Sequence, residues 1–229
     1  MATRSSKPAA IAKLPLPGFV REPGWEFSLM LVLEVIFLFG AVPALSAGPA
    51  DRDLVRFLQL VLAGVAIALI AKSALLRIVL ATSFALTLLV SLLPDRMPLA
   101  ATLGMGFAYN FLVTAVMARA VFGRGEVNHH RIAGAVFIYL NIALLFAIAF
   151  AGLRVFSPDA INGIAGDAPV RLSEMVHFSF ATLTTIGDGA IAPQSPFAKS
   201  LSDLETVIGH LFPAILLSRL VGLHLSRSQ

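Results

Sequence analysis

Long apolar stretches alternate with short polar ones along most of the chain. A helix needs about 20 mostly apolar residues to cross the hydrocarbon core of a bilayer. Six stretches approach that length, at 27–46, 54–71, 74–93, 99–119, 131–153 and 200–223. The pattern therefore predicts six transmembrane helices.

The segment between the last two stretches has a different pattern. It runs for about 46 residues and contains several charged side chains, followed by an apolar stretch, His177–Leu183, that is too short to span. Irregular backbone at membrane depth is tolerated only where protein shields it or where it lines water. We therefore expect a re-entrant loop beside an aqueous cavity.

Composition excludes a soluble globular domain. Hydrophobic residues make up 58% of the 229 residues and charged residues 13%, and the mean hydropathy is +0.87. Soluble domains carry about 25% charged residues. There is no cysteine, which excludes a disulfide framework, a thiolate metal site and a cysteine nucleophile. The expected class is an all-α, multi-pass integral membrane protein.

Basic residues predict the orientation of the chain in the membrane. With both termini in the cytoplasm, 11 of the 17 Lys and Arg residues fall on the inner side, including those of a basic tail at 1–26. Because cytoplasmic loops are enriched in Lys and Arg, this orientation is favoured. It places the re-entrant loop at the outer face.

The most specific motif follows the short apolar stretch. Residues 182–189 read Thr-Leu-Thr-Thr-Ile-Gly-Asp-Gly, and Pro193 and Gln194 come shortly after. Together with a short pore helix, this motif resembles the filter of the tetrameric P-loop cation channel superfamily, with a potassium-channel-like pore domain at 131–225. Gly-Asp-Gly followed by Pro-Gln is most similar to the bacterial nonselective sodium/potassium channel.

The resemblance implies a fold and an assembly. We expect six transmembrane helices, with a re-entrant pore helix and filter loop between helices five and six, and four chains around one axis. It also implies a prokaryotic plasma membrane, no enzymatic activity, and no partner beyond further copies and lipid. Alone, Gly187-Asp188-Gly189 is also typical of an ordinary turn.

The resemblance also assigns the ion-binding residues of the filter. Rings of backbone carbonyls at Thr185, Ile186 and Gly187, with the Thr185 hydroxyl below, replace the water of a dehydrated cation. The complete predicted set of filter residues is Thr184, Thr185, Ile186, Gly187, Asp188 and Gly189. Potassium and sodium are the expected permeating ions, and no other cofactor is expected.

Two departures from the common potassium filter, Thr-Val-Gly-Tyr-Gly-Asp, affect selectivity. Asp188 replaces the Tyr and Ala190 replaces the Asp. Asp188 is too short to bond the pore helix as Tyr does, and Phe178, where relatives often carry Trp, has no donor; Phe178 and Thr182 are the expected filter supports. We expect a wider vestibule, about two dehydrated sites and weak discrimination between sodium and potassium. Carboxylates at the mouth suit Ca²⁺ near Gly187 and Asp188.

Three residues of the last span are gating candidates. Gly209 lies where relatives carry a hinge glycine, and Pro213 removes a backbone donor and favours a kink. Glu205 is one turn before Gly209. A packing glycine, an incidental proline, and a Glu205 that pairs with Lys199 or bonds the loop from behind are equally compatible with the sequence.

The first four spans, at 27–122, form the expected peripheral bundle. Voltage sensors carry several regularly spaced Arg or Lys on the fourth span. The stretch 99–119 has none before Arg119, so activation by voltage is not expected. A potassium-selective channel, a transporter and a non-conducting regulatory subunit remain alternatives.

Overall fold

The computed structural model describes residues 24–44, 98–123, 128–164 and 172–225, together with helical residues at 62, 64–65, 77–79, 81–82, 84–86 and 89. The basic tail at 1–26, except for its last three residues, lies outside the described residues. So do the predicted spans at 54–71 and 74–93, apart from the short helical runs just named. The described part contains helices and two very short strands.

Three described helices are long and apolar enough to cross a membrane. These are α5 (Leu99–Val121), α6 (His129–Phe156) and α8 (Pro196–Leu225), the last over Pro196–Ser218. They extend the predicted spans at 99–119, 131–153 and 200–223 by a few residues at one or both ends. The predicted first span is also helical, as α1 (Trp25–Val35), a π-helical segment η1 (Ile36–Ala41) and α2 (Val42–Ala44).

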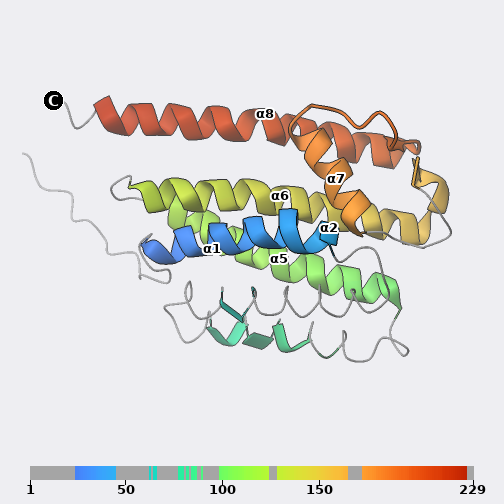
Figure 1. Ribbon diagram of the computed structural model, residues 1–229, viewed down its shortest axis with the longest axis horizontal. Coiled ribbons are helices and arrows are strands. Elements are labelled where there is room, and N and C mark those ends of the chain that lie inside the picture. Colours follow the sequence, from blue (N-terminus) through green and yellow to red (C-terminus); the bar gives the residue numbers. More distant parts are fainter. Residues whose placement is uncertain are drawn as a thin grey trace, which may run out of the picture.

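Helix α6 lies at the centre of the described part (Figure 1). It contacts α1, α5, α8 and the short helix α7 (Leu172–Leu183). One hydrophobic core lies among α1, α5 and the first half of α6, around Phe27, Met117 and Phe137. A second core lies between η1, α7 and the second half of α6, around Phe150 and Phe178.

The turn between α5 and α6 is held by two polar side chains. The Asn128 side chain caps α6 by accepting the Arg131 N–H at 2.8 Å. The buried Arg131 guanidinium donates to the carbonyls of Ala120 at 3.1 Å and Gly123 at 2.7 Å, at the end of α5. A cation there neutralises the negative end of the helix dipole. The two helices are thereby fixed side by side.

A small ladder holds the other end of the molecule. After η2 (Pro158–Ala160), strand β1 (Ile161–Asn162) pairs antiparallel with β2 (Ala192–Pro193), which follows the Gly-Asp-Gly motif. Gly163 has a φ of +89°, and a Cβ there would lie 1.8 Å from the Ala190 carbonyl oxygen. The segment before α7 therefore packs closely against the segment after the motif.

Candidate functional site

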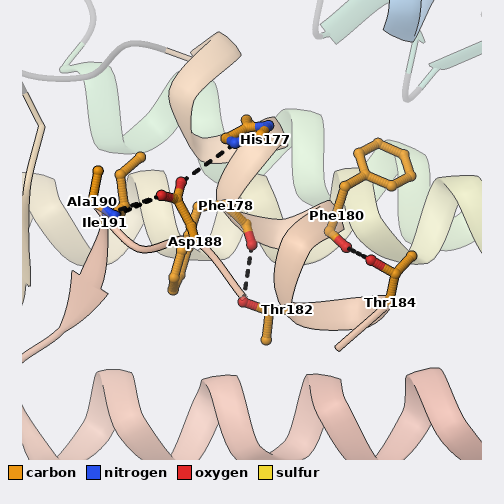
Figure 2. Close-up of polar contacts among 8 residues, drawn as sticks. All are labelled: His177, Phe178, Phe180, Thr182, Thr184, Asp188, Ala190 and Ile191. Carbon is orange, nitrogen blue, oxygen red and sulfur yellow. Dashed lines mark hydrogen bonds and ion pairs between the residues drawn. The ribbon is translucent and has the colours of Figure 1, made fainter. Parts of the chain in front are cut away.

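Helix α7 positions the predicted filter loop (Figure 2). It begins five residues before the apolar stretch from which it was predicted. Glu174 lies in its first turn, where a carboxylate is favourable because of the helix dipole. The loop 184–189 leaves the end of this helix and turns back toward β2.

Three backbone N–H groups of the loop are hydrogen-bonded within the chain. The N–H groups of Thr184, Thr185 and Gly187 donate to the carbonyls of Phe180, Thr182 and Ala181, each at 3.0 Å. The carbonyls of residues 184–187 accept no hydrogen bond from any described residue. These four carbonyl oxygens therefore remain available as ligands for a cation.

Two threonine side chains near the loop are tied to α7. The Thr182 hydroxyl donates to the Phe178 carbonyl at 2.9 Å, and the Thr184 hydroxyl donates to the Phe180 carbonyl at 2.6 Å (Figure 2). These bonds use the hydroxyl protons and leave lone pairs on the two oxygens.

The backbone of the loop is left-handed at two alternate residues. Gly187 has a φ of +77°, which glycine adopts without strain, and Thr185 has a φ of +60°. For a β-branched residue this conformation is a true outlier and costs about 1–3 kcal/mol. Such strain occurs mainly at functional sites. The loop is thus held in a conformation that its sequence does not favour locally.

The loop and the side chain that supports it differ in exposure. Residues 184–187 are exposed, and the Ile186 side chain is 82% exposed. Directly behind them, Phe178 is buried and packs edge to face on Phe150, with ring centroids 4.9 Å apart. Phe178, on the supporting helix, is therefore packed, while the loop residues themselves are exposed.

Asp188 faces the support side. Its carboxylate accepts the N–H groups of Ala190 at 2.9 Å and Ile191 at 3.2 Å, and lies 3.5 Å from Nε2 of His177 (Figure 2). The Asp188 side chain is only 9% exposed, against 72% for His177. In a single chain, then, this carboxylate fixes the loop instead of projecting toward its mouth.

Two polar or close contacts, one helical turn apart, join α6, α7 and α8 behind the loop. In the first, the Ser179 hydroxyl lies between the Ala143 carbonyl oxygen, at 2.6 Å, and the carboxyl of Glu205. In the second, the Tyr139 hydroxyl donates to the Leu183 carbonyl at 3.4 Å, and Gly209 packs on that same carbonyl. Each helix contributes residues four apart, which share one helical face.

The gating candidates differ in their surroundings. A Cβ on Gly209 would lie 1.9 Å from the Leu183 carbonyl oxygen, so this glycine allows close approach of α8 to the loop. Glu205 is fully buried and bonds Ser179 from behind the loop, with no ion pair to Lys199. Pro213 is exposed, and α8 continues through it as one helix (Figure 1). Of the expected roles, packing fits Gly209 and support of the loop fits Glu205.

Sequence reasoning did not single out Tyr139, Ala143 or Ser179. Their spacing from Glu205 and Leu183 along the chain carries no signal, although Tyr139 and Ala143 lie on one helical face. Three other polar residues, on α1, α5 and α6, form a buried chain of hydrogen bonds. Asn141 donates to Glu34 at 3.3 Å and accepts from the Thr114 hydroxyl at 3.0 Å. Among the described residues no cluster of three side chains suits a metal ion.

Comparison with known proteins identifies one family. Residues 132–223 match the family model described as ion channel, which covers about two-fifths of the chain, from α6 through the loop to α8. The match supports an ion channel of the potassium-channel-like superfamily, spanning a membrane, and it indicates a channel protein and not an enzyme. No curated protein and no solved structure has a significant match to the chain.

Proposed function

We propose that four copies of this chain form a channel that conducts sodium and potassium ions with weak selectivity through the loop 184–189. The observation that carries the proposal is the row of carbonyls at 184–187, which belong to exposed residues and accept no hydrogen bond from any described residue. A dehydrated cation needs several oxygen ligands on more than one side. A single loop offers them from one side only, so further copies must complete the ring.

Weak selectivity is proposed from the residue at 188. Asp188 caps the loop locally, through the Ala190 and Ile191 N–H groups, and its carboxylate is held away from the open side. Phe178, buried behind the loop, has no polar group that holds the upper carbonyls at fixed spacing. Discrimination between two cations by a carbonyl filter depends on the number and spacing of its ligands. About two dehydrated sites, at Thr185 and Ile186, remain our expectation.

Four further elements belong to the proposal. The termini lie in the cytoplasm of a prokaryotic cell, and the peripheral helices at 27–122 support the pore without sensing voltage. Ca²⁺ binds near Gly187 and Asp188 through backbone oxygens. Gating moves the part of α8 that follows Gly209, while the close contact of Gly209 with the end of α7 is kept.

Single-channel recording in planar bilayers tests this function. Purified protein should give discrete current steps, with a reversal potential close to zero when sodium and potassium replace each other across the membrane. A reversal potential near that of potassium would instead favour the potassium-selective alternative. The absence of steps from well-folded protein would favour the non-conducting subunit.

A further inference from the structure

The Ser179 hydroxyl, behind the filter loop, makes two close contacts with oxygen atoms but has only one proton for them. The Ser179 oxygen lies 2.6 Å from the Ala143 carbonyl oxygen and within hydrogen-bonding distance of a Glu205 carboxyl oxygen. A carbonyl oxygen only accepts, and a serine hydroxyl has one proton to give. If Glu205 is ionised, two acceptors compete for this one proton, and one close oxygen pair is left without any.

Burial of Glu205 makes the ionised form still less favourable. The side chain is 0% exposed, and its second carboxyl oxygen has no hydrogen-bond partner among the described residues. Within the described part no Lys, Arg or His side chain bonds Glu205. A carboxylate at membrane depth without a cationic partner or a full set of donors is strongly disfavoured.

A protonated Glu205 carboxyl group supplies the missing proton, so that both contacts of Ser179 are hydrogen bonds. Glu205 then donates to the Ser179 oxygen, and Ser179 donates to the Ala143 carbonyl, so both contacts contain one proton each. We infer that Glu205 is a neutral carboxylic acid in the conducting protein and a positioning residue that fixes α7 between α6 and α8. This inference rests on the proposed function only in that it takes the protein to conduct ions.

The position of the contact explains how it acts on the loop. Ser179 lies one helical turn before Leu183, whose carbonyl receives the Tyr139 hydroxyl and packs on Gly209. Loss of the Glu205 proton would break the contact between Ser179 and Glu205. The contact at the Leu183 carbonyl would then have to hold the same three helices together without it. The filter loop begins at the next residue, Thr184, so its starting point would shift.

Other ionisable groups near these helices are few. Tyr139 of α6 interacts electrostatically with Glu205. On α7 and α8, the other ionisable residues whose side chains the structure describes are Glu174, His177, Lys199, Asp203 and His210. His177 is held at Asp188, and Lys199, Asp203 and His210 are exposed. None of them offers Glu205 a compensating charge.

Infrared difference spectroscopy on purified protein tests the proton directly. A neutral carboxyl group and a carboxylate absorb at different frequencies, so Glu205→Gln should remove one neutral-carboxyl band from the spectrum at neutral pH. Glu34→Gln identifies the band of the other fully buried carboxyl, and Asp203→Asn on α8 is the exposed control, expected to change only carboxylate bands. An unchanged neutral-carboxyl region in Glu205→Gln would overturn the inference.

Bilayer recordings test the positioning role. Glu205→Gln keeps a donor for Ser179, so we expect wild-type open probability, whereas Glu205→Ala should lower it about tenfold, as expected when a buried polar partner is left unpaired. Raising the pH should lower the wild-type open probability and leave Glu205→Gln unaffected. A Glu205→Gln variant as impaired as Glu205→Ala would show that the charge is required, contrary to the inference. The infrared measurement does not require ion flow. If Glu205→Gln loses the neutral-carboxyl band but neither the wild type nor any variant gives current, the proposed channel function is rejected and the neutral Glu205 is retained.

Discussion

The two long helices that flank the loop 184–189, α6 and α8, are covered very differently. In their most apolar stretches, 61% of α6 but only 11% of α8 is buried within the chain. Helix α6 packs on α1, α5, α7 and α8, while α8 contacts its own chain mainly along the face of Glu205 and Gly209. The difference indicates that α6 completes its packing in one chain and α8 does not.

The uncovered side of α8 carries a stripe of apolar residues. We define the α8 stripe as Leu204, Val207, Leu211 and Ile215, all more than half exposed. Their spacing of three and four residues places them along one side of the helix. The loop 184–187 is open as well. In the proposed channel, the other three copies cover the stripe and complete the ring of carbonyls.

The largest effect is expected where α8 touches the loop. Gly209→Ala adds a methyl group 1.9 Å from the Leu183 carbonyl oxygen, so α8 must move, at a cost of about 1–3 kcal/mol or more. We expect lower thermal stability and no current. Gly152→Ala on α6 is the matched control, because its added methyl group meets nothing within 4 Å.

The two glycine variants have the same gain in helix propensity, about 1 kcal/mol. Any difference between them therefore reports the contact alone. Equal melting temperatures and equal currents for Gly209→Ala and Gly152→Ala would show that the approach of α8 to the loop does not matter.

A smaller effect is expected from the α8 stripe. Leu211→Asn places a polar group in the proposed contact between copies, where a central residue contributes about 2 kcal/mol. Each contact between copies should weaken roughly thirtyfold, and light scattering in detergent should show a lower ratio of tetramer to monomer. Val136→Asn, at an exposed position of α6, should leave it unchanged. Equal dissociation of both variants would contradict the claim that α8, and not α6, needs other copies to complete its packing.

The smallest effect concerns ion choice at the open loop. Asp188→Tyr with Ala190→Asp restores the residue types of the common potassium filter and gives the loop a side chain long enough to reach its support helix. The potassium to sodium permeability ratio should rise roughly threefold, since one added hydrogen bond per chain contributes about 0.5–1.5 kcal/mol. Bi-ionic reversal potentials measure this ratio. An unchanged ratio would place selectivity elsewhere.

Sequence periodicity predicted the long helices well and their contacts poorly. The ends of α5, α6 and α8 follow from apolar runs of sufficient length. The start of α7 was predicted too late, because Leu172 and Glu174 follow a charged segment that resembles a loop in composition. The contact of Ser179 with Glu205 joins residues 26 apart in the chain, and only packing of α7 on α8 brings them together.

The orientation of Asp188 had a local signal that was not used. Aspartate often accepts backbone N–H groups two residues ahead, and Asp188 does so at Ala190. Its placement near the mouth was inferred from its position in the filter-like motif, without this competing interaction. The left-handed backbone at Gly187, in contrast, agrees with a motif that places a glycine there.

Cryo-electron microscopy of the purified protein in lipid tests the central claim most directly. The account predicts four chains around one axis, with the α8 stripes in contact between copies and ion density beside the carbonyls of Thr185 and Ile186. A monomer or a dimer, or a tetramer whose loops 184–189 face away from the axis, would contradict it.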